Sequence, residues 1–250
     1  MIRLLISDVD GTLLKAGERA ISENIKKKLR AFITSGGTVA IASGRTYASL
    51  RLLLGDMADS VYLIPCDGAL CIKGERVLYH RPIPSETVRK AFSVAKENGL
   101  SLHLAAATHG YACGDSDFLS KLTEEHTDEV STVSTPAEVR EQIYKIAFYG
   151  KSPCFTTVPA ELRLSYKGNG WKEYVYRYAD KGTALSDLQS RLYMAKFDTA
   201  AIGDGLNDVT MLKGAKYAFA LTEELKSALP NATLTETVFE AFEIIGKVNI

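Results

Sequence analysis

The sequence has no excess of charge of either sign and no long hydrophobic run. Its 30 Lys and Arg residues balance 30 Asp and Glu residues, so the composition does not favour binding to nucleic acid or to an anionic membrane. The longest unbroken apolar run covers residues 217–221, whereas a membrane-spanning helix needs about 20 apolar residues. Asp8 comes too early for the hydrophobic part of a secretory signal. We therefore expect a cytoplasmic protein with no membrane or nucleic-acid partner.

Cysteine and histidine are scarce, and neither has the spacing of a metal site. The 4 Cys residues form no CxxC pair, and the 4 His residues show no ligand spacing. A structural zinc site is therefore not expected, and disulfides are not expected in a cytoplasmic protein. The P-loop motif, GxxxxGK followed by Ser or Thr, is also absent.

Short apolar runs alternate with helical segments in the first third of the chain. Residues 2–7, 38–42 and 61–64 are typical of buried strands, and helices are expected over residues 22–35 and 45–54. Ser22 is a suitable N-cap for the first helix. This alternation predicts parallel strands joined by right-handed crossovers.

The same alternation returns from residue 181. A helix is expected over residues 181–195, strands over 199–202 and 217–221, and a further helix from residue 207. Two more helical segments follow. The two ends of the chain together predict an α/β fold with a doubly wound, mostly parallel, Rossmann-like sheet.

The middle of the chain has a different pattern. A helix over residues 86–96 precedes β-rich runs, and residues 162–166 and 173–178 flank KGNGW, whose Asn-Gly step is a hairpin signal. Antiparallel pairing here predicts a separate α+β module. We expect a core domain of residues 1–81 and 179–250 with an inserted cap domain of residues 82–178.

Two carboxylates follow the first predicted strand. Residues two apart in an extended segment point the same way, so Asp8 and Asp10 can face one site. Gly11 lets the backbone turn away after them. Ligands of open α/β sheets bind at this edge, outside the carboxyl ends of the strands. The competing interpretation of the pair is a solvated turn or a helix cap.

A second acidic segment, Gly203-Asp204-Gly205-Leu206-Asn207-Asp208, follows the strand at residues 199–202. It begins like a dinucleotide fingerprint, but an acid stands at the third glycine position and would repel a pyrophosphate. Asp204 and Asp208 instead bring two more carboxylates to the crevice. Oxygen ligands alone select a hard cation, and magnesium is the common intracellular choice.

Two further segments are neutral or positive. Ser43-Gly44-Arg45 follows the second strand, where a hydroxyl and free amides at a helix start can bind an anion. The competing interpretation of Ser43 is an N-cap alone. Lys181 opens another helix at the expected domain boundary and, taken alone, is typical of a surface lysine.

Together these residues are what phosphoryl transfer through an aspartyl-phosphate requires. DVDGTLL, IASGR, ADKGTAL and GDGLND resemble, in this order, the four motifs of the haloacid dehalogenase superfamily. The arrangement is most similar to its Cof-type phosphatases, whose cap is inserted between the second and third motifs. The resemblance covers residues 1–82 and 179–220 through the motifs, and the cap only by position and size. It implies a magnesium-dependent phosphatase acting on a small phosphorylated metabolite, such as a sugar phosphate.

The resemblance also implies a role for each motif residue. Asp8 would be the nucleophile, and Asp10 the general acid and then the base. Magnesium would be held by Asp8, the backbone carbonyl of Asp10, and Asp204, with Asp208 in support. The phosphoryl group would be bound by Ser43, Gly44, Lys181 and Asn207. Each role suits the chemistry of its side chain or backbone group.

The sequence departs from the family pattern at three places. Asp67-Gly68 stands where Asn-Gly is usual, and Thr222-Glu223 replaces a small Asn-Ala step. Residues 151–161 are short for the helix that usually precedes the last cap hairpin. We expect Arg45 and Asp67 to be candidate substrate contacts and the cap pocket to be atypical.

Some residues and functions keep two interpretations. We expect the aromatic side chains of the hairpin to pack on one of its faces, with ligand stacking as the alternative; these are Trp171, Tyr174, Tyr176 and Tyr178. Two histidines of the cap, His103 and His109, are candidates to face substrate. The alternative functions are a phosphomutase, which returns the phosphoryl group to the sugar, and a non-catalytic sensor of a phosphorylated ligand. We expect a small-molecule phosphorylated substrate and a monomer or homodimer.

Overall fold

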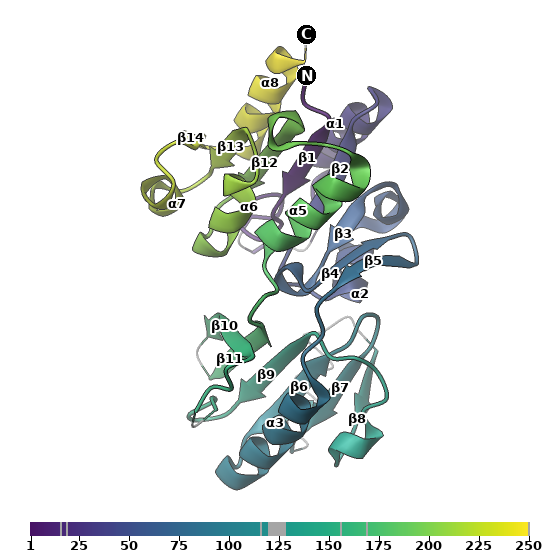
Figure 1. The fold of residues 1–250 in the computed structure, drawn as a ribbon, viewed down its shortest axis with the longest axis vertical. Helices are drawn as coiled ribbons and strands as arrows, with labels where there is room; N and C mark the ends of the chain where they lie inside the picture. The colour runs from purple at the N-terminus through teal and green to yellow at the C-terminus, as the bar shows by residue number, and fades with distance from the viewer. Residues whose placement is uncertain are drawn as a thin grey trace.

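A computed structural model describes residues 1–249 except 16, 19, 116, 120–128, 156 and 169. The described residues form two β-sheets that lie at opposite ends of an elongated molecule, with both chain termini beyond the larger sheet (Figure 1). The larger sheet has eight strands in the order β14-β13-β12-β1-β2-β3-β4-β5, and the smaller has six in the order β10-β11-β9-β6-β7-β8.

The eight-stranded sheet is built from both ends of the chain. Its strands are β1 (Leu4–Ser7), β2 (Thr38–Ala42), β3 (Tyr62–Ile64), β4 (Leu70–Lys73), β5 (Arg76–His80), β12 (Thr199–Gly203), β13 (Tyr217–Ala220) and β14 (Thr233–Leu234). Pairing is parallel from β14 through β12, β1 and β2 to β3, and antiparallel only at β4 and β5. The strand order reverses between β1 and β12, which makes this the topological switch point where ligands of such sheets bind.

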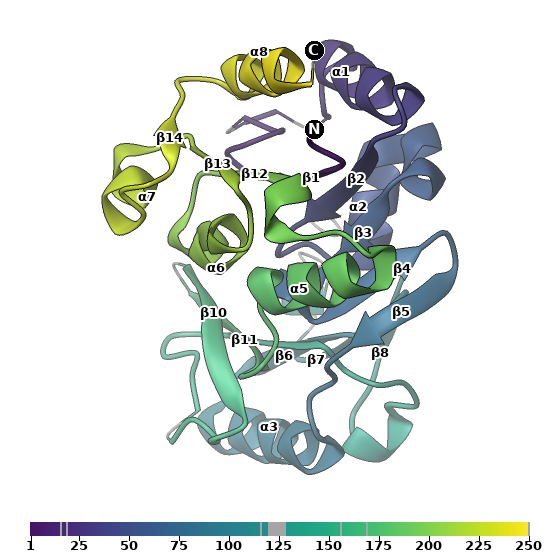
Figure 2. The ribbon, with the colours of Figure 1, turned by 45° about the horizontal axis from the view of Figure 1, so that its top comes forward.

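Helices cover both faces of this sheet (Figure 2). Helices α1 (Glu23–Thr34), α2 (Tyr47–Leu54) and α8 (Val238–Val248) share one hydrophobic cluster with alternate strand residues such as Leu5 and Ile41. Helices α5 (Lys181–Leu192), α6 (Val209–Lys213) and α7 (Glu223–Ala228) share a second cluster with the intervening residues, such as Leu4 and Ala40. Successive residues of a strand point to opposite faces of the sheet, and helices cover both faces. The strands are therefore apolar at nearly every position. The predicted doubly wound α/β fold is confirmed.

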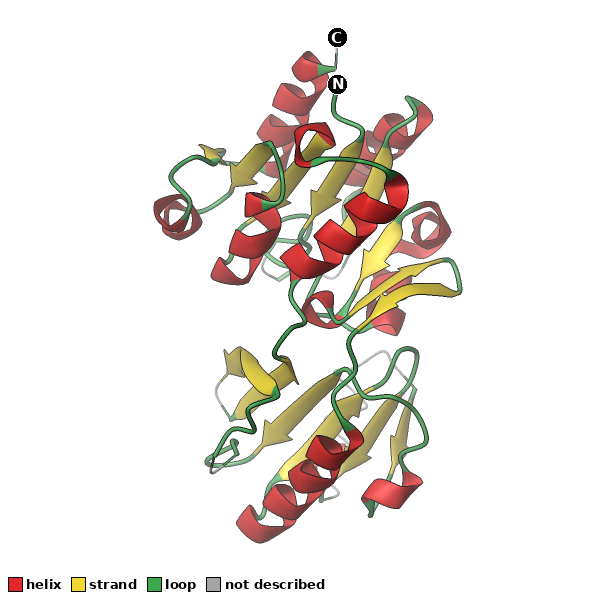
Figure 3. Cartoon of the chain, viewed as in Figure 1, coloured by secondary structure: helices red, strands yellow, loops and turns green. Residues whose placement is uncertain are grey.

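The six-stranded sheet consists of β6 (Ser101–Ala105), β7 (Gly110–Cys113), β8 (Val130–Thr132), β9 (Lys145–Tyr149), β10 (Leu162–Gly168) and β11 (Trp171–Tyr176). One face packs on α3 (Ser85–Asn98) through a cluster that includes Leu104, Phe148 and Tyr174. Figure 2 shows α3 at the far end of the molecule, so the other face of this sheet is turned toward the larger sheet. Figure 3 shows two connections crossing between the two sheets.

Several local predictions agree with the structure. Ser22 caps α1 and accepts a hydrogen bond from the amide of Ile25, and β2 covers the expected residues. β10 and β11 pair as an antiparallel hairpin, although residue 169 of the expected Asn-Gly turn lies outside the described residues. The described residues of 151–161 form no helix.

Other local predictions were wrong. The helix expected from Arg45 begins at Tyr47, because Thr46 is its N-cap and accepts from the amide of Ser49. The Ser43 hydroxyl instead accepts from the Arg45 amide at 3.1 Å, so residues 43–45 form a loop and Ser43 is not an N-cap. The helix from residue 181 ends at Leu192 rather than 195, where Tyr193 takes the left-handed conformation.

The sequence reading also missed the β4–β5 hairpin and strands β7, β8 and β14. No helix among the described residues is both long enough and apolar enough to cross a membrane.

Candidate active site

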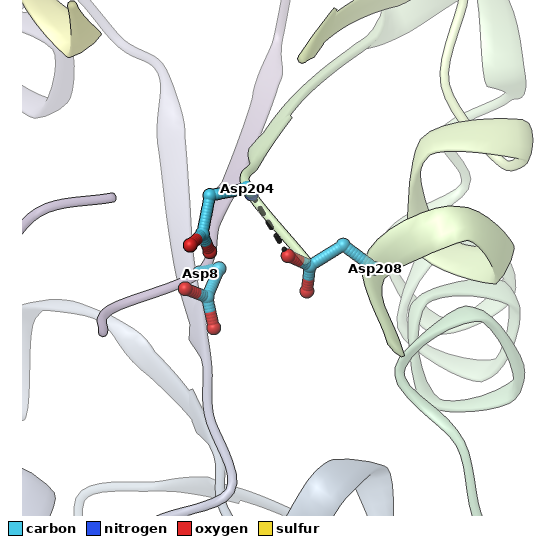
Figure 4. A group of neighbouring side chains, drawn as sticks. All are labelled: Asp8, Asp204 and Asp208. Carbon is cyan, nitrogen blue, oxygen red and sulfur yellow. Dashed lines mark hydrogen bonds between the residues drawn. The ribbon is translucent and has the colours of Figure 1, made fainter. Parts of the chain in front are cut away.

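Two carboxylates lie where the strand order reverses. Asp8 directly follows β1, and Asp204 directly follows β12. The two strands are neighbours and pair in parallel, with Ser7 opposite Ile202, so their carboxyl ends bring the two side chains to one edge of the sheet. Asp208 approaches from the start of α6 and completes a group of three (Figure 4).

This group has the properties of a cation site. Each of Asp8, Asp204 and Asp208 offers one carboxylate oxygen, and these oxygens lie within 4.8 Å of one another. Oδ2 of Asp8 is buried without a hydrogen-bond partner among the described residues. A buried acceptor that lacks a partner is costly, and a hard divalent cation is the ligand that oxygen-only donors select. The residues therefore fit a bound Mg²⁺.

Lys181 provides the buried positive charge beside these acids. Its Nζ donates to Oδ1 of Asp8 and to Oδ1 of Asp208, both at 2.6 Å, and the residue is only 1% exposed. Asp180 caps α5 by accepting from the amides of Gly182 and Thr183, which fixes the start of this helix. The interpretation of Lys181 as a surface lysine was therefore wrong, because the two buried carboxylates compensate its charge.

The same burial shifts the pKa values of the cluster. Burial raises the pKa of Asp8 to about 7, and the Asp208 and Asp204 carboxylates add to this rise while Lys181 opposes it. Burial by itself would lower the pKa of Lys181, but Asp8 and Asp208 outweigh it and the pKa lies above its ordinary value. The site thus holds its negative charge in a low-dielectric environment, which favours a cation.

Asp204 is positioned by groups around it. Oδ2 of Asp208 accepts from the amides of Asp204 and Gly205, both at 3.1 Å, so Asp208 shapes this loop. Thr12 donates to Asp204 Oδ1 at 3.3 Å, and Thr222 donates to the Asp204 carbonyl at 2.6 Å. The Thr222 that departs from the family pattern therefore supports the acidic loop.

Gly11 is required for the close approach of its loop to Asp204. Its φ is +88°, and a Cβ atom at this position would lie 2.0 Å from Oδ2 of Asp204. A side chain would both strain the backbone and displace the carboxylate. The close approach of Asp204 therefore explains why a glycine follows the two acids of DVDGT.

Asp10 lies apart from the three-carboxylate group and is held by Arg45. The Arg45 guanidinium donates to both carboxylate oxygens of Asp10, from Nη2 at 2.7 Å and from Nε at 2.9 Å. Ser43 donates to Oδ2 of Asp10 at 3.4 Å. The Asp10 side chain is 51% exposed, so it remains accessible from the cleft. The structure thus brings Asp10, Ser43 and Arg45 together.

Asp67, another candidate substrate contact, is buried and pairs with a lysine from the smaller sheet. Its φ is +54°, and its Oδ2 lies 3.6 Å from Nζ of Lys145 on β9. Asn207 donates to Asp67 Oδ1 at 3.5 Å. Burial alone would raise the pKa of Asp67, but Lys145 and Lys181 lower it below the ordinary value.

Sequence reasoning missed Lys145 and its partner Glu173 on β11, whose Oε2 lies 2.6 Å from Lys145 Nζ. A signal was available, because Lys145 is the single charged residue in the apolar run IYKIAFY. A lysine that is buried in a strand almost always has a partner.

A cleft of about 420 Å³ joins these residues to the smaller sheet. Its floor includes Asp8, Asp10, Gly44, Asp204 and Asn207, and the opposite wall carries residues from the smaller sheet: His103, Ala105, Lys145, Ser165, Tyr166, Trp171 and Glu173. Of the two histidines expected to face substrate, His103 lines this cleft. His109 instead hydrogen-bonds Ser131 at 2.9 Å and lines a different cavity.

The aromatic residues of the hairpin divide between its two faces. Tyr174 is buried against α3, whereas Trp171 lines the cleft and stacks on Tyr166, with ring centroids 5.7 Å apart. The expectation that all of them pack one face was wrong, because Trp171 has the opposite strand parity to Tyr174.

The fold and site define a class of protein: a doubly wound α/β protein with acids at the switch point of its sheet and a second sheet facing them across a cleft. A family model described as haloacid dehalogenase-like hydrolase matches residues 5–238. The chain belongs to this family, and the predicted resemblance and enzyme class are confirmed.

Known proteins are similar over nearly the whole chain. A provisionally named phosphatase of Haemophilus influenzae is 27% identical over 245 residues, covering 91% of this chain and 89% of that protein. An HMP-PP phosphatase of Yersinia pseudotuberculosis is 26% identical, covering 92% and 88%. A solved phosphatase of the same superfamily from Bacteroides thetaiotaomicron is 22% identical with a TM-score of 0.81, covering 99% and 95%. This last likeness shows the shared fold.

Proposed function

We propose that this chain is a magnesium-dependent phosphatase that hydrolyses a small phosphorylated metabolite, a sugar phosphate or similar phosphomonoester, through an aspartyl-phosphate. The observation that carries the proposal is the convergence of Asp8, Asp204, Asp208 and Lys181, of which Asp8 and Asp204 line the cleft. Phosphatase names among relatives that match about nine tenths of the chain support it.

The metal would be held by Asp8, Asp204 and the backbone carbonyl of Asp10, with Asp208 in support. When bound, it supplies positive charge to the oxygens of the phosphoryl group. The partnerless Oδ2 of Asp8 supports this assignment.

The reaction begins with attack by the Asp8 carboxylate on phosphorus, which forms an acyl-phosphate bond and breaks the bond to the leaving oxygen. Asp10 gives its proton to that oxygen. In the second half, Asp10 takes a proton from water, which attacks the phosphorus and releases Asp8 and inorganic phosphate. Lys181, Ser43, the amide of Gly44 and Asn207 would stabilise charge on the transferring oxygens.

Arg45 has a defined part in this scheme. Its guanidinium donates to both carboxylate oxygens of Asp10 and so fixes the direction in which they point. Arg45 is therefore a positioning residue for Asp10.

We also propose that residues 82–178 form a cap domain over a core of residues 1–81 and 179–250. The two connections between the sheets follow β5 and β11, and the residues with assigned chemical roles lie in the core. The cap would supply contacts to the leaving group.

Phosphate release from a panel of sugar and nucleotide phosphates tests the function directly. We expect free phosphate from at least one ester in the presence of magnesium. A rearranged phosphate ester without free phosphate would identify a phosphomutase instead. Binding of a phosphorylated compound with no turnover of any ester would favour the sensor.

The aromatic wall of the cleft gives a prediction about the substrate. We expect Trp171→Leu to raise KM for the preferred ester about tenfold or more, because base or ring stacking contributes about 1–3 kcal/mol per ring. kcat for the small substrate acetyl phosphate should change much less, because it has no ring to stack. Steady-state kinetics on both substrates measure this. Equal loss on both substrates in a folded variant would contradict a leaving-group contact.

A further inference from the structure

Lys145 links the smaller sheet to two loops of the larger one. Its Nζ donates to the backbone carbonyl of Gly44 at 2.6 Å and lies 3.6 Å from Asp67 Oδ2. On its own sheet it pairs with Glu173 at 2.6 Å. One ammonium group therefore contacts the loop after β2, the loop after β3 and a neighbouring strand.

The direction of this side chain follows from strand register. Lys145 lies opposite Ala105 on β6 and Val175 on β11, and its neighbour Ile146 points into the core under α3. Successive strand residues alternate between faces, so Lys145 must point toward the larger sheet. The small side chain of Ala105 leaves room beside it in the cleft.

Charge balance shows that the contact is specific. Lys145 is only 7% exposed, and Asp67 only 4%. Burial by itself would lower the pKa of Lys145, but Glu173 and Asp67 outweigh it and the pKa lies above the ordinary value. The Lys145 ammonium group donates to the Gly44 carbonyl and to the Glu173 carboxylate, and it forms a longer ion pair with Asp67, so its buried charge is compensated.

The Gly44 carbonyl belongs to the loop after β2, in which Gly44 and Arg45 line the cleft and Ser43 donates to Asp10. A Cβ at Gly44 would lie 3.3 Å from Asp67 Oδ1, so the two loops already touch. The Lys145 ammonium sits across both of them. It also accounts for an aspartate at position 67, because the neutral asparagine of the family pattern would leave Lys145 with one carboxylate fewer.

We propose that Lys145 is a positioning residue through which the cap holds the phosphate-binding loop in place, so that the chemical step itself depends on the cap. The inference rests on the proposed phosphatase function. The proposed role differs from that of a cap that only determines substrate specificity, because the contacts of Lys145 outside its own sheet are to the core. Its loss should therefore slow hydrolysis of any phosphate ester, including one with nothing for the cap to recognise.

The test uses acetyl phosphate and p-nitrophenyl phosphate with the full chain and magnesium. We expect Lys145→Met to lower kcat on both substrates by about 10²-fold, the loss expected from a displacement of about 1 Å at reacting groups. KM should change less than kcat, because the phosphate contacts themselves remain. Lys172→Met is the matched control, since Lys172 pairs with Phe148 on the face turned away from the cleft. This control should keep both rates within about twofold.

A double variant keeps the test valid if the single variant fails to fold. Lys145→Met leaves the buried Asp67 and the partly buried Glu173 without their cation, whereas Lys145→Met with Asp67→Asn removes one of those charges. The double variant still lacks the donor to the Gly44 carbonyl, so we expect it to stay slow. A return to the wild-type rate would show that Lys145 only neutralises charge and would overturn the proposal.

Failure of the function and failure of this inference give different results. If the wild-type chain releases no phosphate from these two substrates or from any ester of the panel, the proposed function is wrong. If the wild-type chain is active and folded Lys145→Met is equally active on acetyl phosphate, the positioning role is wrong.

Discussion

Asp8→Asn should abolish turnover and leave the protein unlabelled by substrate. The amide cannot attack phosphorus, so no aspartyl-phosphate forms. Asp10→Asn should behave differently in kind. An aryl phosphate has a good leaving group that needs little protonation, so the first half-reaction proceeds. The attack of water still needs its base, and loss of a general base slows such a step by about 10²–10⁴-fold.

Intact-mass spectrometry after an acid quench separates the two variants. The Asp10 variant should carry the added phosphoryl mass and release phosphate slowly, and the Asp8 variant should carry none. Asp187→Asn is a matched control, because Asp187 pairs with Arg191 on the outer surface of α5. A labelled Asp8 variant, or a label that maps to Ser43, would overturn the assignment of the nucleophile.

Much of the site could be predicted from the sequence because its residues directly follow strands. Asp8 and Asp204 come directly after short apolar runs, and parallel strands put their carboxyl ends at one edge. Placing these two aspartates at one site needs only the pairing rule for parallel strands, and no knowledge of contacts between distant residues. The predicted α/β fold rests on the same local pattern and was confirmed.

The burial of charged side chains was harder to predict from the sequence, because it depends on partners that lie far apart in the chain. Lys181 is buried by Asp8, which lies 173 positions away. Lys145 reaches Gly44, which lies 101 positions away. A lone sequence shows the unusual lysine in an apolar strand but not the carbonyl that accepts its hydrogen bond. The distribution of the hairpin aromatics shows the same limit, since strand parity separates Trp171 from Tyr174 but does not say which face is the cleft.

Some local signals were present and were missed. β4 and β5 are joined by a two-residue turn, with Lys73 opposite Arg76 and Gly74 at φ +58°. Glycine in such a turn is a recognised hairpin signal. The start of α2 was misplaced for a related reason, because Thr46 is also a residue type that caps helices and is the N-cap in the structure.

Removal of divalent cations should abolish activity, and added magnesium should restore it. Asp8, Asp204 and Asp208 lie together with one lysine between them, so the folded protein holds excess negative charge that a cation relieves. Calcium should inhibit, because its looser coordination suits in-line transfer poorly. Activity assays after chelation, with each metal added back, measure these effects. Full activity in excess chelator would contradict a metal-dependent reaction.

Magnesium should also raise the melting temperature, a readout that does not depend on turnover. A ligand at 100 times its Kd stabilises the folded state by about 2.7 kcal/mol, which corresponds to about 5–10 °C for a chain of this size. Asp204→Asn removes a proposed ligand, so both the melting shift and the activity should be lost. Asp187→Asn should keep both, because its carboxylate lies on the surface of α5. An undiminished magnesium shift in folded Asp204→Asn would place the cation elsewhere, even if that variant were inactive.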